Sequence, residues 1–175
     1  MRFKKIFLPK EINELKSLKV GEWLLLNGPI FSARDQACKL LVDLIKEGKG
    51  IPLELKNSLI YHMGPSPTPP GRVSGSAGPT TSKRMDPFVS WLLSQGIVGF
   101  IGKGKRDKET EMYFKKYKGV YLVTVGGAGA YLGDKIKKME IFAFPELGPE
   151  AIYYLEVEDF PAMVAIDSEG NSFWK

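Results

Sequence analysis

The chain has 175 residues, 43% of them hydrophobic and 26% charged, and a formal net charge of +5. This length and composition suit a soluble globular protein, and we expect one domain over residues 1–175. No apolar run approaches the roughly 18 residues that a membrane-spanning helix needs. No signal-peptide pattern follows the basic start. We therefore expect a cytoplasmic protein with no membrane partner.

The pattern of charged residues and the scarcity of cysteine and histidine exclude further classes of protein. Lysines and glutamates alternate along the chain, which is typical of a solvated surface, whereas a nucleic-acid binder would show a dense basic stripe. The single cysteine, Cys38, excludes an internal disulfide and a cysteine-only metal site. The single histidine, His62, leaves almost no imidazole for metal or acid–base chemistry. We expect no metal site in this chain, so any metal chemistry needs ligands from another chain.

The first part of the chain predicts a strand followed by a helix. The apolar run over 20–26 ends at the turn signal Asn27-Gly28-Pro29 and predicts a buried strand. Ser32, with Asp35 three residues later, predicts a capping box at the start of a helix. Gly48 is a natural end for that helix.

The middle of the chain predicts a short strand over 59–63, a long loop and a second helix. The Pro- and Gly-rich residues 64–78 are interpreted as an active-site loop, because the residues before them would make a poor independent core. The helix pattern covers 81–95. Because Pro87 fits only a first turn, Asp86 is an alternative start for that helix.

The remaining pattern is rich in strands. Together the elements predict an α/β domain with more than one sheet or a mixed sheet. The predicted elements are strands over 97–101, 120–125, 135–144, 152–157 and 162–166, a charged helix over 106–118 and a hairpin turn over 168–171.

Residues 74–84, Ser-Gly-Ser-Ala-Gly-Pro-Thr-Thr-Ser-Lys-Arg, form the first candidate site. Glycines let the backbone approach a ligand closely, and free N–H groups with hydroxyls at a helix start favour an anion. Arg84 can hold a carboxylate through two parallel hydrogen bonds. The same residues also suit a helix cap beside a surface arginine, and the residue types alone favour neither interpretation.

Three further segments are weaker candidates. Lys103 follows an apolar strand and can place a positive charge at the ligand side of an α/β sheet, although an ordinary basic loop fits as well. Arg34 lies in a first helical turn, where the helix dipole prefers acids; such a conflict often marks a functional residue, although Arg34 can also simply face solvent. Residues 126–130 match a dinucleotide-binding glycine loop incompletely, and tight packing or a backbone ligand contact are the alternatives.

Cys38 and His62 are expected to be structural. Cys38 lies toward the apolar side of its predicted helix, which favours an inert packing role. His62 ends a predicted strand just before the Pro-rich loop, and we interpret it as a hydrogen-bonded structural histidine.

The order of these segments resembles one family. The pattern Gly-Pro-Thr-Thr-x-x-Arg-Met-Asp at 78–86 resembles the hallmark of the C-terminal domain of class I fumarases and of the β subunit of tartrate dehydratase. The resemblance covers nearly the whole chain, and the combination of motifs is highly specific. Further matching segments, in family order, are 26–30, 34–35, 61–64, 103–104, 126–132, 145–148 and 156–162.

The resemblance implies a swivelling β/β/α domain that completes the active site of a larger partner. That partner, an α subunit or an N-terminal domain, would carry three cysteines and a [4Fe-4S] cluster, and this chain alone would bind no cofactor. An α2β2-type hetero-oligomer is implied. The site residues implied are a catalytic Thr80 for proton transfer and the substrate-binding residues Arg34, Gly78, Thr81, Arg84 and Lys103.

Two positions depart from the family pattern. Cys38 stands where members often have histidine, and Lys83 replaces a commonly small residue beside Arg84. The first departure leaves open a supporting role at that position, and the second affects access to the arginine.

The resemblance implies the β subunit of a fumarate hydratase that interconverts malate and fumarate. Eliminating water from a 2-hydroxy dicarboxylate needs fixed positive charges, and a Lewis-acidic iron would help hydroxide leave. A free threonine is too weak a base, so Thr80 would need activation by the other subunit. The alternatives are a tartrate dehydratase β subunit, a non-catalytic dicarboxylate-binding module and, third, a nucleotide-binding protein.

Overall fold

The computed structural model describes residues 2–125 and 128–174 of the chain. Its centre is one seven-stranded mixed sheet of strand order β1-β2-β3-β4-β5-β7-β6, which confirms the predicted α/β class with a mixed sheet. No helix in these two ranges has the length and apolarity needed to cross a membrane.

The strands are β1 (Phe3–Phe7), β2 (Trp23–Ser32), β3 (Leu59–Tyr61), β4 (Gly99–Gly102), β5 (Val120–Val123), β6 (Ile136–Ala143) and β7 (Ile152–Ile166). The α-helices are α1 (Asp35–Lys46), α2 (Asp86–Ser94), α3 (Lys108–Tyr117) and α4 (Gly129–Asp134). The 3-10 helices are η1 (Ile12–Ser17), η2 (Leu53–Leu55), η3 (Ser82–Met85) and η4 (Pro145–Glu150).

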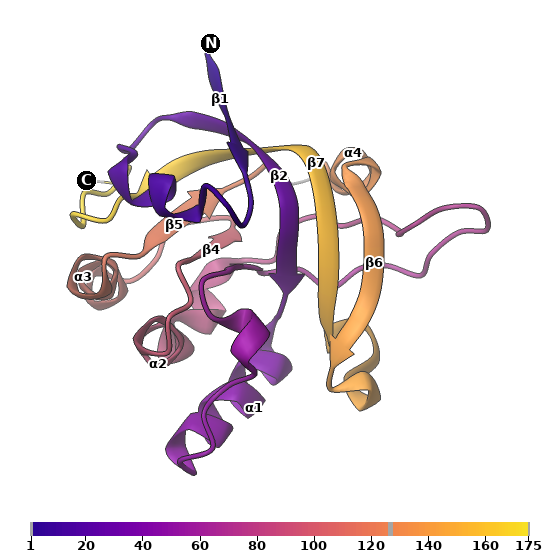
Figure 1. Ribbon diagram of the computed structural model, residues 1–175, viewed down its shortest axis with the longest axis horizontal. Helices are drawn as coiled ribbons and strands as arrows, with labels where there is room; N and C mark the ends of the chain where they lie inside the picture. The colour runs from indigo at the N-terminus through magenta and orange to yellow at the C-terminus, as the bar shows by residue number, and fades with distance from the viewer. Residues whose placement is uncertain (1, 126–127, 175) are drawn as a thin grey trace.

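Two long strands, β2 and β7, join the two ends of the chain. They pair antiparallel from Trp23 opposite Met163 to Ser32 opposite Tyr153, and Figure 1 shows them side by side through the centre of the molecule. β2 also pairs with β3, and β7 with β5, while β3, β4 and β5 are parallel neighbours. These pairings close a ring of β2, β3, β4, β5 and β7, to which β1 and β6 are added at the outside.

Side-chain alternation along the short strands produces two cores. In β3, Leu59 and Tyr61 enter one buried cluster, whereas Ile60 enters the other. The second cluster also holds residues of α1, α2 and α3, so these three helices cover one face of the sheet (Figure 1). The first cluster receives side chains from η1 and α4 on the other face, among them Leu15 and Leu132.

The predicted helix cap at Ser32 is wrong. Ser32 is the last residue of β2, and its hydroxyl accepts a hydrogen bond from the Tyr153 N–H at 3.2 Å. Helix α1 begins at Asp35 after Arg34, whose side chain makes no cap. The pairing of β2 with β7 thus extends the strand past the point where the local pattern indicated a helix start.

The strands predicted over 152–157 and 162–166 are one strand, β7. The apparent break is an irregularity in its pairing with β2, where Asp159 has a φ of +50° and donates its N–H to the Asn27 side chain at 3.0 Å. The prediction also omitted β1 and α4. The alternative helix start at Asp86 is confirmed.

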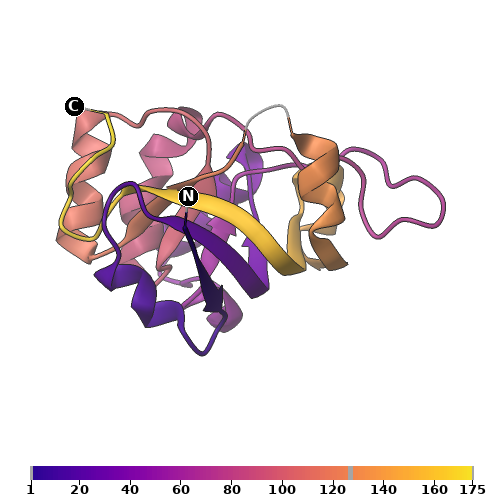
Figure 2. The ribbon, with the colours of Figure 1, turned by 90° about the horizontal axis from the view of Figure 1, so that it is seen from above.

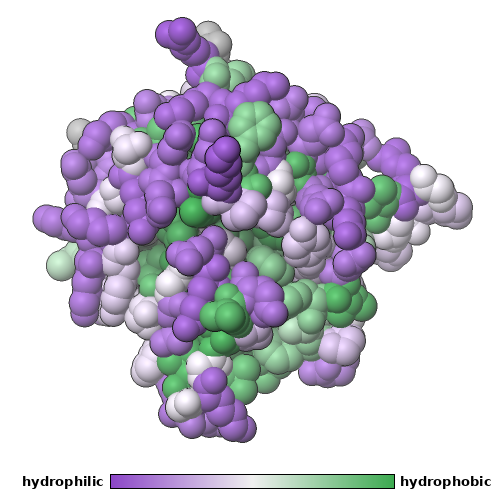
Figure 3. Space-filling model, viewed as in Figure 1, coloured by the Kyte–Doolittle hydropathy of each residue, from purple (hydrophilic) through white to green (hydrophobic). Residues whose placement is uncertain are grey.

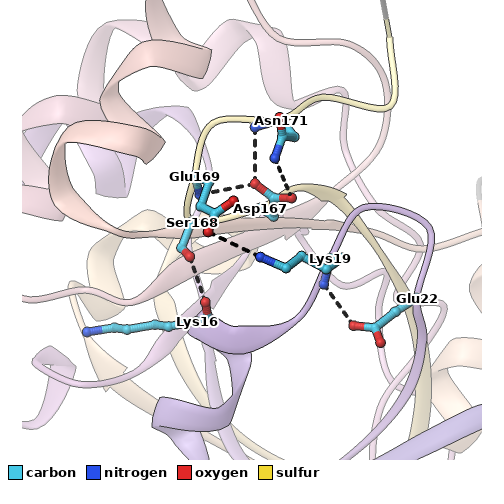
Figure 4. Close-up of polar contacts among 7 residues, drawn as sticks. All are labelled: Lys16, Lys19, Glu22, Asp167, Ser168, Glu169 and Asn171. Atoms are coloured by element: carbon cyan, nitrogen blue, oxygen red, sulfur yellow. Dashed lines mark hydrogen bonds and ion pairs between the residues drawn. The ribbon is translucent and has the colours of Figure 1, made fainter.

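The predicted hairpin turn over 168–171 is confirmed by an antiparallel bridge between Ile166 and Ser172. The Asp167 carboxylate accepts the N–H groups of Glu169 and Asn171, both at 3.0 Å (Figure 4). The turn is fixed to the N-terminal region because Ser168 donates its hydroxyl to the Lys16 carbonyl at 2.6 Å. It therefore closes the chain's C-terminal end onto η1.

The Pro-rich loop forms a projecting arm, defined here as residues 64–76. Its base is closed by the Ser66 N–H, which donates to the Ser76 carbonyl at 3.1 Å. Its tip extends past α4 in Figures 1 and 2, and Arg72 forms an ion pair with Asp134 of that helix. Figure 3 shows that the face of Figure 1 is mostly hydrophilic, as the interspersed lysines and glutamates predict, with apolar side chains gathered below its centre.

We predict that Gly28→Ala destabilises the chain by about 1–3 kcal/mol more than Gly21→Ala. Both glycines have a positive φ, +111° and +93°, so each alanine adds backbone strain. Only at Gly28 would the new Cβ also meet a backbone atom, the Leu8 carbonyl oxygen at 2.3 Å. Urea unfolding of both variants measures the difference, and equal losses would contradict the steric argument.

Candidate active site

Four strand ends define one edge of the sheet. Because β2, β3, β4 and β5 are parallel neighbours, their carboxyl ends lie at the same edge, which is where α/β sheets usually bind ligands. Within two residues of those ends the chain carries Arg34, His62, Lys103 and Thr124. Two predicted site residues, Arg34 and Lys103, therefore come to one edge from strands far apart in the sequence.

The Gly-Pro-Thr-Thr turn lies against this edge. The Thr80 N–H donates to the carbonyl of His62 at 2.7 Å. Thr81 forms a parallel bridge with Lys103, and the Ser82 N–H donates to the Lys103 carbonyl at 3.1 Å. The turn thus continues the hydrogen-bonding pattern beyond β4 and holds both threonines beside Lys103.

The two predicted site arginines approach the same region. Arg84, in η3, forms an ion pair with the Oδ1 atom of Asp35 at 3.2 Å, between side chains that are about half exposed. Asp35 directly follows Arg34, whose side chain lies over Gly64: a Cβ there would meet Nη1 at 2.6 Å. Among the described residues, nothing accepts a hydrogen bond from the buried Nε of Arg34. With Lys103, the edge gathers positive charge of the kind that stabilises a carboxylate ligand.

Gly78 packs against the start of α4. A Cβ at Gly78 would stand 3.4 Å from the Cα of Gly129, and the neighbouring Ala77 N–H donates to the Gly129 carbonyl at 3.0 Å. This contact explains a small residue at the position, while a role in substrate binding stays a prediction. Residues 126 and 127 of the glycine-rich segment lie outside the described residues.

A buried ion pair between Arg106 and Asp86 lies next to the Gly-Pro-Thr-Thr turn. The helix predicted over 106–118 begins at Lys108, and Arg106 before it is buried, with Nε 2.6 Å from Oδ1 of Asp86. The other oxygen of Asp86 accepts the Asp107 N–H at 2.9 Å. Since Asp86 directly follows η3, this pair fixes the end of the site turn. The Arg106 guanidinium also lies over three rings at 4.8–6.0 Å from their centroids, those of Phe100, Phe114 and Tyr121.

His62 lies beneath the same turn and is fully buried. Its Nδ1 lies 3.1 Å from the Ala33 carbonyl oxygen; since that oxygen can only accept, Nδ1 carries the proton. Burial first, and then the positive charge of Arg106, lower the pKa of His62 to about 3 against the opposing effect of the Ala33 bond. The ring is therefore neutral at physiological pH, in agreement with the structural role predicted for it.

The chain's own side chains do not fit an iron–sulfur cluster. Cys38 is buried between α1 and the sheet, and this burial raises the pKa of its thiol to about 12, as expected of an inert packing residue. Within residues 2–125 and 128–174, no group of three or more His, Cys, Asp or Glu side chains is arranged to hold a metal ion.

We predict that Asp86→Ala lowers the free energy of unfolding by about 3–5 kcal/mol, because it leaves the buried Arg106 charge uncompensated. The matched control is Asp43→Ala, which removes an exposed pair with Lys39 at 3.4 Å and should cost less than about 1 kcal/mol. Urea unfolding measures both variants. Similar losses would show that the buried pair has no special role.

We also predict a pH-dependent stability difference between the wild-type chain and His62→Asn. The folded pKa of His62, about 3, lies below the unfolded value near 6.5, so the unfolded chain binds the extra proton between these values. The neutral His62 therefore contributes to the free energy of unfolding in full above about pH 6.5. This contribution is lost on acidification, by up to about 1.4 kcal/mol per pH unit. Because His62 is the only histidine, urea unfolding at several pH values from about 7 to 5 isolates it. Parallel stability curves would refute the prediction.

The chain matches the family described as Fumarase C-terminus over residues 2–175. It is 42% identical over 166 residues to the aerobic class I fumarate hydratase of Salmonella typhimurium, covering 94% of this chain and 29% of that protein. It is 41% identical over 169 residues to fumarate hydratase 2 of Leishmania major, covering 95% of this chain and 30% of that protein.

A third relative has a different length. The putative L(+)-tartrate dehydratase subunit beta of Methanocaldococcus jannaschii is 39% identical over 168 residues, covering 93% of this chain and 86% of that protein. The chain therefore spans less than a third of the two fumarate hydratases but most of this subunit. On the match over nearly its whole length, the chain belongs to the Fumarase C-terminus family.

Proposed function

We propose that this chain is the small subunit of an iron–sulfur hydro-lyase that reversibly dehydrates a 2-hydroxy dicarboxylate, malate to fumarate, with a cluster-bearing α subunit. The observation that carries the proposal is the arrangement of Arg34, Arg84 and Lys103 around the Thr80–Thr81 turn. Two relatives that match this chain over 166 and 169 residues are named fumarate hydratases, which supports the choice of reaction.

The cationic side chains suit the charge that develops in this reaction. Removing a proton from the carbon next to a carboxylate builds negative charge on that carboxylate, and fixed cations and donors stabilise it. Arginine can hold a carboxylate through two parallel bonds. The ion pair of Arg84 with Asp35 uses one nitrogen of the guanidinium, so the other N–H groups are available to a substrate. We assign Arg34, Arg84 and Lys103 to the two substrate carboxylates.

Thr80 is proposed to transfer the proton. Its backbone is held by the hydrogen bond to the His62 carbonyl, which places its half-buried side chain at the edge defined by the strand ends. A threonine hydroxyl is too weak a base to remove this proton unaided. A group of the α subunit must therefore activate it. Thr81 and Gly78 are proposed to shape the same turn around the substrate.

The α subunit is proposed to hold the [4Fe-4S] cluster with three cysteines. When bound, the cluster supplies Lewis-acid chemistry at the substrate hydroxyl. The half-exposed Arg84 and the partly buried Arg34 and Lys103 suit a site that a second subunit completes by excluding water. We further propose an α2β2 assembly in the cytoplasm, in which this chain acts as a swivelling β/β/α domain.

A tartrate dehydratase β subunit is the second candidate. The specific observation that favours it is the Methanocaldococcus relative of that name, of which this chain covers 86%. Both substrates present two carboxylates and a hydroxyl, so the same three cations serve either reaction.

The proposal is tested by co-expressing the chain with its neighbouring α-type gene product and reconstituting the cluster without oxygen. Dehydration of malate is expected, and faster dehydration of tartrate would instead support the second candidate. If neither substrate is dehydrated, the catalytic proposal is wrong.

Calorimetric titration of the chain alone tests the non-catalytic module. A site shared with the α subunit should bind malate and fumarate weakly, whereas tight binding without the α subunit would favour that module.

We predict that Arg84→Lys lowers kcat/KM of the assembled enzyme by about 10- to 100-fold. Lysine keeps the charge but loses the paired hydrogen bonds, which are worth about 1.5–3 kcal/mol when made to a charged group. The control is Arg2→Lys, at an exposed position in the same chain, which should leave kcat/KM unchanged. Wild-type kinetics for Arg84→Lys would contradict its assignment to a substrate carboxylate.

A further inference from the structure

We infer that His62 is a positioning residue that fixes the Arg34 side of the site relative to the Thr80 side through its Nδ1–H bond. The inference rests on the proposed function for its kinetic consequence, but the geometry is a property of this chain. Although His62 is fully buried, its polar groups bond to both sides of the site, to Thr80 and to Ala33 beside Arg34.

His62 connects three segments that meet at the site edge. Its N–H donates to the Ile101 carbonyl in β4 at 2.8 Å, and its carbonyl accepts the Thr80 N–H at 2.7 Å. Its side chain donates from Nδ1 to the Ala33 carbonyl at 3.1 Å. The two backbone bonds survive a change of side chain, whereas the bond to Ala33 depends on the imidazole.

The Ala33 carbonyl matters because it shares a planar peptide unit with the N–H of Arg34. On the other side, the Ala33 N–H already donates to the Tyr61 carbonyl at 3.0 Å. Because both the N–H and the carbonyl of Ala33 are hydrogen-bonded, the orientation of the peptide plane between Ala33 and Arg34 is fixed. Arg34 itself is extended, with φ −114° and ψ −159°, and makes no side-chain cap to α1, so the imidazole bond supplies the local constraint that a cap would otherwise provide.

The imidazole is itself held in one orientation. It stacks on Phe100 with ring centroids 5.2 Å apart and an angle of 16° between the planes. On the side of β4, a Cβ at Gly102 would come within 3.4 Å of Cδ2, so the ring fits against a glycine. His62 has no exposed surface, so it does not contact a substrate at the edge and acts on the site only through the residues to which it bonds.

The test compares His62→Asn with His62→Gln. The amide nitrogen of asparagine can occupy the place of Nδ1, whereas that of glutamine reaches only the place of Nε2. Both variants lose the stacked ring, so their thermal unfolding temperatures should fall alike. In the assembled enzyme we expect kcat/KM to fall about 100-fold for glutamine, as for a displaced substrate-binding group, and by less than about tenfold for asparagine. Equal losses, or losses that follow the unfolding temperature, would overturn the inference.

A second measurement does not depend on activity. Nitrogen-15 NMR of the full chain should show a neutral imidazole protonated at Nδ1, and the Arg34 amide signal should shift in the glutamine variant but not in the asparagine variant. Protonation at Nε2, or equal shifts in both variants, would overturn the inference. An assembled wild-type enzyme without either dehydration would refute the proposed function, and the NMR result would still decide the role of His62.

Discussion

The antiparallel pairing of β2 with β7 is the contact on which the rest of the fold depends. It joins residues 23–32 to residues 153–163, and each strand then offers its other side to further strands. Without it, the strands in the order β1-β2-β3-β4-β5-β7-β6 would form an open sheet, and the sides of β2 and β7 that now pair with each other would be unpaired edges. Within the closed ring, the parallel strands β2, β3, β4 and β5 have their carboxyl ends together at one side, and the candidate site lies there.

The site combines exposed positive charges at its surface with a buried positive charge that is paired with a carboxylate. The half-exposed Arg84 meets solvent, whereas the buried Arg106 is neutralised by Asp86 and surrounded by aromatic rings. Water weakens the attraction between an exposed cation and a carboxylate, and a second subunit that excludes water would strengthen it. Under the proposed function, the site therefore binds a dicarboxylate well only when a second subunit covers it. The buried pair of Arg106 with Asp86 and the bond from Thr80 to the His62 carbonyl hold the turn in place.

Local patterns predicted the elements whose residues contact their own neighbours. The strands around residues 59–63 and 120–125 and the body of α1 were recognisable because alternation and helical periodicity reflect burial on one face. The predicted ends of helices and strands were wrong where pairing with a distant strand decides where an element ends. Ser32 continues β2 because Tyr153 pairs with it, although the residues around it suit a helix cap. The edge strand β1, with one buried residue among five, has too little pattern to be recognised.

By itself, the sequence determined the family and the candidate residues, since the spacing of the Gly-Pro-Thr-Thr-x-x-Arg-Met-Asp motif is a local property. Its single cysteine and histidine also limited the metal chemistry open to the chain. Only the tertiary structure decided that Arg106 is buried against Asp86, that Asp35 meets Arg84, and that His62 bonds to Ala33. The partners in these contacts lie 20, 49 and 29 positions apart in the chain. Periodicity reports which face of an element is buried, but it carries no information on which distant side chain meets it there.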